Sequence, residues 1–265
     1  MTPVPAGSPL KGMPVEQYLS DPSLKQQFVT PMFDIIAPRY DAFTRVFSFG
    51  MDARWKRELL AAVATSIAPR TVALDLACGT GDLAFAVAAL APRVHVTGID
   101  ASARMIDAAN ARLVTRDPAT PTFVEGQTAP AFVVGDLTRL DVPDASVDTV
   151  TAGYALRNVP DARAGLVEIA RVMKPGGRLY TLDFYRPEPI VWRRLFLGYL
   201  DLAGNAVGWL WHREPVIYGY IARSVDHFVS ADTFSTLLRE SGFVVERVSR
   251  KLFGGVALHC ARRVV

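Results

Sequence analysis

The chain has 265 residues, of which half are apolar, so it can bury the core of one large domain, with or without extensions. Its formal net charge of +3 is small for this length and its basic residues are scattered, which argues against a nucleic-acid partner. Two cysteines, Cys78 and Cys260, without metal-ligand spacing predict neither a disulfide framework nor a metal site, and they fit a reducing cytoplasm.

The first segment of the chain differs in composition from the rest. Residues 1–22 are rich in proline and small residues and predict a flexible N-terminal tail without the features of a signal peptide. Residues 23–66 read as a helical cap that is interrupted near Pro31, Pro38 and Gly50. No apolar run is long enough to span a bilayer, so we expect a cytoplasmic protein that is soluble or at most peripheral to a membrane.

From residue 70 onward the pattern alternates between apolar strands and amphipathic helices. This alternation predicts βαβ units, and therefore an α/β fold with a parallel sheet covered on both faces. A helix at 231–243 precedes two strands, at 244–252 and 256–262, which should pair antiparallel across a short turn. The predicted parallel strands are 71–77, 94–100, 131–136, 146–155 and 178–184, and the helices between them are 81–91, 102–114 and 161–173.

The first strand end carries the clearest functional signal. Gly79 and Gly81 allow a sharp turn and a close approach to a ligand, at the edge of the sheet where α/β proteins bind their ligands. A dinucleotide would favour a third glycine, but Ala84 stands there, and Asp82 would repel a pyrophosphate. Asp75, just before the turn, would suit a cationic head group.

Two further carboxylates follow at the next strand ends. Asp100 is placed to take the hydroxyls of a ribose, and Asp136 could accept from the exocyclic amine of adenine. Each acid alone could equally cap a helix, but three at successive strand ends favour a ligand. An amino acid joined to a nucleoside has all three features, so the pattern fits S-adenosylmethionine (SAM) better than NAD.

Segments throughout the chain resemble a known family. VALDLACGTGDLAFAV, VTGIDAS and VVGDLTRL look like the SAM-binding motifs of class I methyltransferases. FDIIAPRYDAFTRVFSFGMDARWKREL, YALRNVPDARAGLVEIARVMKPGGRLYTLDF, YIARSVDHFVS and FGGVALH resemble the ubiquinone/menaquinone C-methyltransferases (the UbiE/MenG family). The resemblance implies a Rossmann-like, seven-stranded, mostly parallel sheet with helices on both faces and an antiparallel last strand. It implies methyl transfer from SAM to a ring carbon of a polyprenyl quinol, with S-adenosylhomocysteine as product.

The resemblance also implies roles for individual residues. Arg157 and Asn158 match a pair proposed to work at the reacting ring: Arg157 could stabilise a phenolate or orient a water that Asn158 fixes. Tyr154 and His259 are rival proton acceptors, and a salt bridge from Arg157 to an acid such as Asp161 is the structural alternative. The expected cofactor-binding residues are Tyr40, Asp75, Gly79, Thr80, Gly81, Asp100, Ala101, Asp136, Leu137 and Gly153.

Several readings stay open at this point. Gly153-Tyr154-Ala155 stand where the family often has Ser-Phe-Gly, which leaves room for a same-fold enzyme that acts on another aromatic acceptor. A SAM-binding scaffold without catalysis is a further alternative, and the chain could form a homodimer. Lys56 and Arg57 read as a solvated helix face, with a role in closing the cofactor site as the alternative.

The aromatic-rich stretch at 187–222 interrupts the alternation and predicts a helical insertion. Its tryptophans could pack on the sheet. Alternatively, Arg186, Arg193 and Arg194 beside Trp192 and Phe196 could meet a membrane surface and admit an isoprenoid tail. The two readings can hold together, and we expect peripheral membrane contact.

Overall fold

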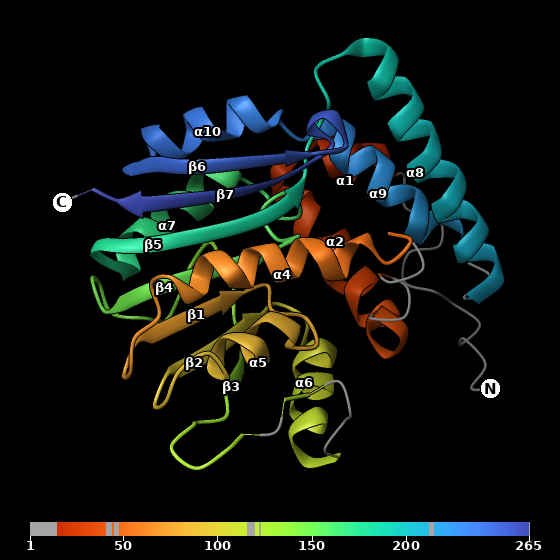
Figure 1. Ribbon diagram of the computed structural model, residues 1–265. Helices are drawn as coiled ribbons and strands as arrows, with labels where there is room; N and C mark the ends of the chain where they lie inside the picture. The colour runs from red at the N-terminus through yellow and green to blue at the C-terminus, as the bar shows by residue number, and fades with distance from the viewer. Residues whose placement is uncertain are drawn as a thin grey trace.

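The computed structural model describes residues 15–40, 44, 48–115, 120–121, 123–211 and 215–264. A seven-stranded sheet runs through the centre in the order β3-β2-β1-β4-β5-β7-β6. Six strands are parallel and β7 is antiparallel to both of its neighbours, which confirms the predicted sheet (Figure 1). The strands are β1 (Val72–Leu76), β2 (His95–Asp100), β3 (Ala131–Val134), β4 (Val147–Gly153), β5 (Met173–Phe184), β6 (Phe243–Lys251) and β7 (Val256–Arg263).

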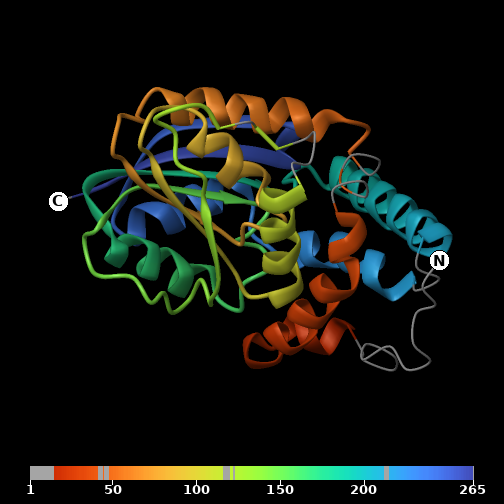
Figure 2. The same ribbon diagram turned by 90° about the horizontal axis from the view of Figure 1, so that it is seen from below.

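Helices cover both faces of the sheet (Figures 1 and 2). Helix α4 packs on β5 and α5, and α6 packs on β2 and β3, whereas α7 and α10 lie on the opposite face. The helices are α1 (Val15–Ser20), α2 (Pro22–Ile36), α4 (Met51–Ala64), α5 (Asp82–Ala88), α6 (Ala103–Thr115), α7 (Ala162–Val172), α8 (Ile190–Trp211), α9 (Pro215–His227) and α10 (Ala231–Glu240), with short 3₁₀ turns η1 (Ala37–Arg39) and η2 (Leu252–Gly254).

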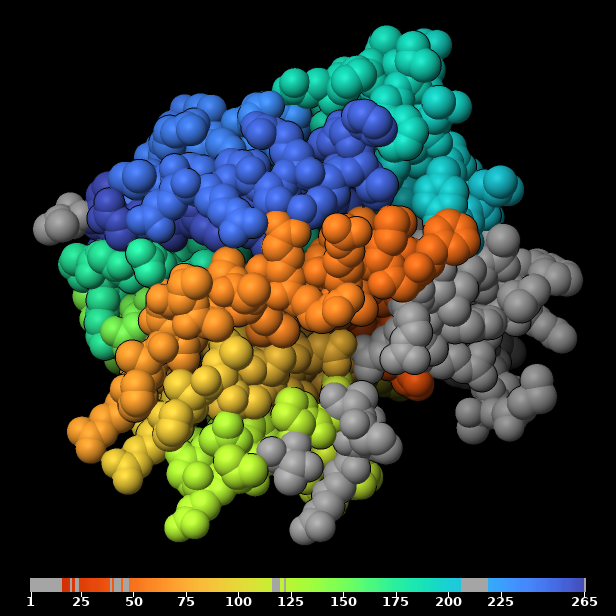
Figure 3. Space-filling model, in the orientation of Figure 1, coloured from red at the N-terminus to blue at the C-terminus, as the bar shows by residue number. Residues whose placement is uncertain are grey.

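The alternation of side chains along β1 divides the core into two clusters. Leu74 and Leu76 face the cluster under α7 and α10, whereas Ala73 belongs to the cluster under α4 and α5. Asp75 alternates with these leucines, so its carboxyl emerges on the α4 side of the sheet. The surface of this side shows the segment of α4 crossing between the C-terminal strands and α5 (Figure 3).

The N-terminal helices depart from the predicted boundaries. Most of the predicted tail lies outside the described residues, but Val15–Ser20 forms α1, which contacts α2 and α9 and buries Leu19. Helix α2 continues through Pro31, so the predicted interruption there is wrong. Gly50 does mark a boundary, because it takes a left-handed conformation directly before α4.

The insertion at 187–222 forms most of a helical hairpin, in which α8 and α9 pack against each other. Within the described part of the chain, no helix combines the length and the apolarity needed to cross a membrane.

Candidate active site

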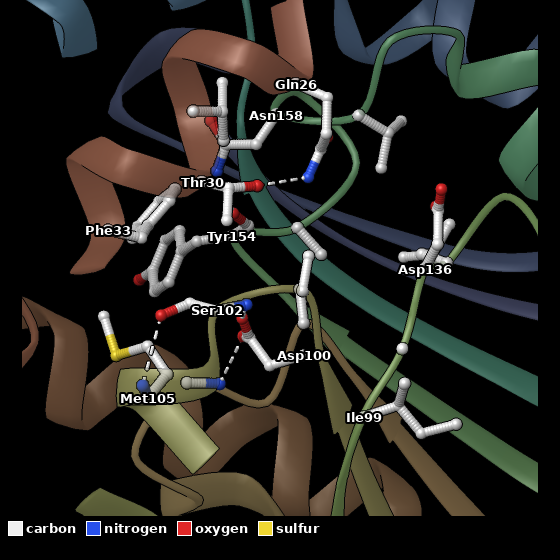
Figure 4. Close-up of a pocket in the computed structure, with 18 of the residues that line it drawn as sticks. Gln26, Thr30, Phe33, Ile99, Asp100, Ser102, Met105, Asp136, Tyr154 and Asn158 are labelled. Carbon is white, nitrogen blue, oxygen red and sulfur yellow. Dashed lines mark hydrogen bonds between the residues drawn. The ribbon is translucent and has the colours of Figure 1, made fainter. Parts of the chain in front are cut away.

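A cavity lies at the carboxyl ends of β1, β2, β3 and β4, beneath α2. Its volume, including the mouth, is about 670 Å³. In Figure 4, Gln26, Thr30 and Phe33 of α2 approach it from one side and Asp136 from the other, with Asp100 between them. The lining also includes Val29, Tyr40, Ala77, Gly79, Ile99, Ala101, Ser102, Met105, Gly135, Leu137, Gly153, Tyr154, Ala155, Asn158 and Val159.

A second hollow, here named the turn pocket, adjoins this cavity along the turn after β1. The two share the lining residues Tyr40, Ala77, Gly79, Gly153 and Tyr154, so they form one continuous site. The turn pocket is also lined by Lys56, Asp75, Cys78, Thr80, Asp82, Leu83 and Leu182. Nine of the ten predicted cofactor residues therefore line the site, and Gly81 is the exception.

Gly81 allows close packing at the turn after β1. Its φ is +89°, and a Cβ built there would lie 2.7 Å from Cζ of Phe132. The glycine therefore lets the ring of Phe132 pack against the turn. Neither hollow is lined by Gly81, and its predicted ligand contact stays a prediction.

Backbone donors fix the carboxylate of Asp100 at the floor of the cavity. Gly79 N–H donates to Oδ2 and Ser102 N–H to Oδ1, both at 2.8 Å. Burial nevertheless raises the pKa of Asp100. Each oxygen keeps a lone pair for a ligand, as two vicinal hydroxyls would require.

Asp136 is the most exposed of the three strand-end acids. Its Oδ1 accepts from the backbone N–H of Thr138 at 2.8 Å and from the Thr138 hydroxyl at 2.7 Å. One oxygen thus stabilises the local turn, as the capping alternative implied, while the residue still lines the cavity.

Asp75 is buried, with only 1% of its surface exposed. Thr151 donates a 2.8 Å hydrogen bond to Oδ1, whereas Oδ2 is buried without a hydrogen-bond partner. Burial raises the pKa of this carboxyl to about 7, although the bond from Thr151 opposes the shift. A buried acceptor that lacks a partner and lines the turn pocket fits the cationic end of the expected cofactor.

A network of charges surrounds the start of α5. Lys56 Nζ lies 3.0 Å from Asp52 Oδ2 and 3.2 Å from Asp82 Oδ2, and Arg112 Nη1 lies 2.7 Å from Asp82 Oδ1. Burial opposes the ionisation of Asp82, but the two cations outweigh it and hold the pKa of this carboxyl low. The prediction that Lys56 lies on a solvated face is therefore wrong. Because the charge of Asp82 is compensated, the argument against a dinucleotide rests on Ala84 rather than on Asp82.

Arg157 and Asn158 lie together in the short segment after β4, and both are buried. Arg157 Nε is 3.1 Å from Asp183 Oδ1 at the end of β5, so its ionic partner is Asp183 rather than Asp161. Its Nη1 donates to Asn158 Oδ1 and to Ser224 Oγ, both at 3.0 Å. Asp161 instead caps α7 through the backbone N–H of Arg163.

The amide of Asn158 is held in one orientation. Its Oδ1 accepts from Arg157 and, at 2.9 Å, from the hydroxyl of Tyr220 on α9. Its Nδ2 donates to the carbonyl of Tyr154 at 2.8 Å. One N–H of Nδ2 therefore remains for a ligand, and Asn158 lines the cavity.

The structure does not bring His259 to the site. The ring is fully buried on β7, where Nδ1 lies 3.3 Å from the Tyr185 hydroxyl and Nε2 lies 3.1 Å from both Ala231 O and Ser235 Oγ. Burial lowers its pKa to about 4. His259 faces α10, on the opposite side of the sheet from the cavity, so its proposed role as a proton acceptor is not supported.

Sequence reasoning predicted the helical cap but did not name the residues of α2 that line the site. Gln26, Thr30 and Phe33 are spaced by four and three residues and therefore share one face of the helix, which is the signal that could have identified them. Asp34 of the same helix accepts a 2.5 Å hydrogen bond from the Ser102 hydroxyl and thereby joins α2 to the floor of the cavity. Among the described residues, no cluster of His, Cys, Asp and Glu could hold a metal ion.

Solved structures share this fold. A chain in the complex between the Haloferax volcanii Trm112 methyltransferase activator and a methyltransferase aligns with a TM-score of 0.61 and 19% identity, over 88% of this chain and 98% of that one. A SAM-dependent methyltransferase from Aquifex aeolicus aligns with a TM-score of 0.54 and 16% identity, over 79% and 89%. At such identities the likeness concerns the fold alone.

Sequence relatives share a higher identity with this chain than these solved structures do. A demethylmenaquinone methyltransferase of Deinococcus radiodurans is 36% identical over 85% of this chain and 88% of its own length. The ubiquinone/menaquinone biosynthesis C-methyltransferase UbiE of Geotalea daltonii is 36% identical over 83% and 89%. Residues 22–263 match the ubiE/COQ5 methyltransferase family. The chain therefore belongs to the ubiE/COQ5 family of SAM-dependent methyltransferases.

Proposed function

We propose that this protein methylates a ring carbon of a polyprenyl quinol, either demethylmenaquinol or the equivalent ubiquinone precursor. The observation that carries the proposal is the buried Arg157-Asn158 pair beside a cavity whose strand-end carboxylates fit SAM. The names of the Deinococcus and Geotalea relatives support the same acceptor class. We further propose that the protein works in the cytoplasm.

The residues present fit the cofactor. Asp100 and Asp136 offer carboxylates to a ribose and a base, and the unpartnered Oδ2 of Asp75 offers one to an ammonium group. When bound, SAM supplies a methyl group on a sulfonium. The chain itself must orient the acceptor ring, exclude water and increase the electron density at the attacking carbon.

Arg157 and Asn158 can increase the electron density at the attacking carbon. A neutral phenol is a weak carbon nucleophile, and ionising its hydroxyl makes the ortho carbon reactive. The guanidinium of Arg157 does not line the cavity itself. Asp183 and Ser224 hold it, and it donates to Asn158, so we propose that its charge acts on the acceptor from behind Asn158. The remaining N–H of Asn158 can donate to the same oxygen. Arg157 stays protonated at neutral pH, so it stabilises the phenolate and does not itself accept the proton.

The acceptor is expected to be lipophilic, and α8 offers a surface that could meet a membrane. Val191, Leu195 and Leu202 are 71%, 62% and 73% exposed and lie on one face of this helix. Trp192 and Phe196 do not belong to that face. Phe196 is buried, and Trp192 donates through Nε1 to Leu252 O at 2.8 Å. The proposed lipid contact therefore rests on the aliphatic side chains of α8.

Methyl transfer from labelled SAM to reduced acceptors tests the proposal. The panel contains demethylmenaquinol, a ubiquinol precursor and simple phenols, assayed anaerobically with the wild type and with Arg157→Ala. We expect transfer to a ring carbon of one quinol and a loss of about 10²-fold or more in the variant.

Removing Arg157 also leaves Asp183 buried without its ionic partner, which could destabilise the fold. Arg157→Lys keeps a positive charge there, and the midpoint of thermal unfolding of each variant reports any loss of structure. Tight binding of S-adenosylhomocysteine without transfer to any quinol would overturn the proposal. Transfer to simple phenols alone would instead favour an enzyme that acts on another aromatic acceptor.

A further inference from the structure

Tyr154 lies where the cavity and the turn pocket meet. It lines both, only 7% of its surface is exposed, and its ring stacks on Phe184 with centroids 5.3 Å apart. Its backbone has a φ of +57°, which is uncommon for a bulky residue and clusters at functional sites. The resembling family often has phenylalanine here, so the hydroxyl is a feature of this chain that the proposed mechanism has not used.

The hydroxyl of Tyr154 has one defined partner. It donates to Oδ1 of Asp52 on α4 at 2.7 Å. The other carboxylate oxygen, Oδ2, forms an ion pair at 3.0 Å with Nζ of Lys56, on the next turn of the same helix. A carboxylate only accepts hydrogen bonds, which means that the proton of Tyr154 is committed to Asp52.

We propose that Asp52 fixes the Tyr154 hydroxyl as a hydrogen-bond acceptor toward the substrate, so that this dyad selects a hydroxyl-bearing ring over a carbonyl-bearing one and receives the proton of that hydroxyl. The inference rests on the proposed function and deepens it. A reduced quinol presents an O–H group to Tyr154 Oη. The oxidised quinone presents only a carbonyl oxygen, which would face another acceptor.

The proton step balances within the chain. The O–H bond of the substrate breaks and its proton passes to Tyr154 Oη, while the proton already on Oη passes to Asp52 Oδ1. The electron pair stays on the substrate oxygen and increases the density at the ortho carbon. Tyr154 can act as a relay because its hydroxyl already donates to Asp52. Burial, and then the negative charge of Asp52, raise the pKa of its phenol well above the usual value, so the tyrosine does not remain ionised.

Other ionisable groups around Tyr154 do not compete for its proton. Asp183 at the end of β5 is paired with Arg157. Lys56 carries its full complement of protons because Asp82 and Asp52 raise its pKa against the effect of burial. Tyr40 also lines both pockets, but it carries no carboxylate that could take the proton. Asp52 is therefore the carboxylate to which the hydroxyl can pass a proton.

Equilibrium binding tests the selectivity without turnover. A short-chain prenyl naphthoquinol and its quinone are titrated anaerobically into protein saturated with S-adenosylhomocysteine. We expect the wild type to bind the quinol more tightly, and the ratio of the two Kd values to fall about tenfold in Tyr154→Phe. Tyr180→Phe is the matched control, because this buried tyrosine also has a 2.7 Å hydroxyl partner, Ser66 Oγ, but does not line either pocket.

Asp52→Asn gives a sharper test. The ammonium of Lys56 requires an oxygen, so the new amide should turn its oxygen to Lys56 and its NH₂ to Tyr154. Tyr154 then accepts from the introduced amide nitrogen and donates into the cavity. The binding preference should shift from quinol to quinone further than in Tyr154→Phe, because the Tyr154 hydroxyl can now donate to the carbonyl oxygen of the quinone.

The pH dependence of methyl transfer separates proton acceptance from a structural role. At pH 7, Tyr154→Phe should lower kcat about 10²-fold while the Kd of S-adenosylhomocysteine changes less than about twofold. The deficit should shrink as the pH approaches about 10, where a free phenol ionises without help. Unchanged Kd ratios and a parallel pH profile in both variants would overturn the role of the dyad. Failure of the wild type to methylate any quinol would instead overturn the proposed function.

Discussion

Burial changes the pH at which the carboxyl of Asp75 ionises. In water a carboxyl ionises near its ordinary pKa of 3.8, but burial raises the value to about 7 in the turn pocket. The folded state therefore binds more protons than the unfolded state between these two values. The stability contributed by Asp75 is accordingly lost as the pH rises from about 4 to about 7 in the cofactor-free protein.

Cofactor binding should be coupled to the ionisation of Asp75. Because the ionised carboxylate suits an ammonium group, we expect the affinity for S-adenosylhomocysteine to rise between pH 6 and pH 8. Asp75→Asn should flatten this dependence, weaken binding at pH 8 and stabilise the cofactor-free protein there. Calorimetric titrations across the pH range and urea unfolding without ligand measure the two effects. A wild-type affinity that does not vary with pH would contradict the assignment of Asp75 to the ammonium end.

At Gly81, the lack of space for a Cβ atom limits which residues the turn after β1 can carry. Gly81→Ala combines a left-handed conformation with a Cβ only 2.7 Å from Phe132, and we expect it to lower the free energy of unfolding by about 2–4 kcal/mol. Gly176→Ala is the matched control, since Gly176 has a φ of +81° but no atom within 4 Å of its Cβ position. Denaturant unfolding of both variants separates the clash from the backbone strain. Equal losses would show that the contact with Phe132 contributes nothing.

At the scale of elements, α8 carries apolar side chains that the core does not use. Its inward residues Phe196 and Leu200 are buried, whereas Leu195 and Leu202 point to solvent. An exposed apolar face on one helix is expected where a protein meets a lipid surface. The structure thus assigns packing to the inward residues of α8 and leaves the proposed lipid contact to its outward aliphatic residues.

Replacing the outward residues of α8 should weaken lipid binding without unfolding the protein. We expect Leu195→Gln with Leu202→Gln to reduce sedimentation with anionic phospholipid vesicles at least several-fold, and to leave turnover of a short-chain acceptor in solution unchanged. Val114→Gln with Val167→Gln, which alters exposed valines on α6 and α7, provides the control. Equal vesicle binding by both double variants would rule out α8 as the contact surface.

At the scale of the molecule, the site is assembled from parts that lie far apart in sequence. Helix α2 covers the cavity and is tied down by Asp34 to Ser102 and by Lys25, whose Nζ donates to Arg157 O at 2.8 Å. Burial, and then the charge of Arg157, lower the pKa of Lys25 to about 8. The helix thus connects Ser102, at the floor of the cavity, to the Arg157-Asn158 pair.

Cofactor binding should therefore protect α2 as a unit. We expect saturation with S-adenosylhomocysteine at about 100 times its Kd to raise the free energy of unfolding by about 2.7 kcal/mol. Amide hydrogen exchange should slow in 24–36 and at the ends of β1 and β2, and change little in β6 and β7. Ser102→Ala, which removes the bond to Asp34, should reduce the protection of α2 selectively. Uniform protection across the sheet would show that α2 does not close over the ligand.

The sequence by itself determined the sheet and the carboxylates at its edge. Period-two and helical patterns of apolar residues are local properties, and parallel strands must bring their carboxyl ends to one edge. Asp75, Asp100 and Asp136 could therefore be assigned to one site before any contact was known. The resemblance added Arg157 and Asn158, which the fold places beside the same cavity.

Only the tertiary structure decided which partner each charged group meets. Arg157 pairs with Asp183 rather than Asp161, Lys56 joins Asp52 to Asp82, and His259 faces the opposite side of the sheet. Apart from Lys56 with Asp52, which share α4, these pairings join separate elements, and the packing of the core sets the distances between those elements. Periodicity identifies the face of a strand or helix on which a residue lies. It does not identify the side chain that packing brings against that face, and this partner sets the protonation and orientation of the groups in the site.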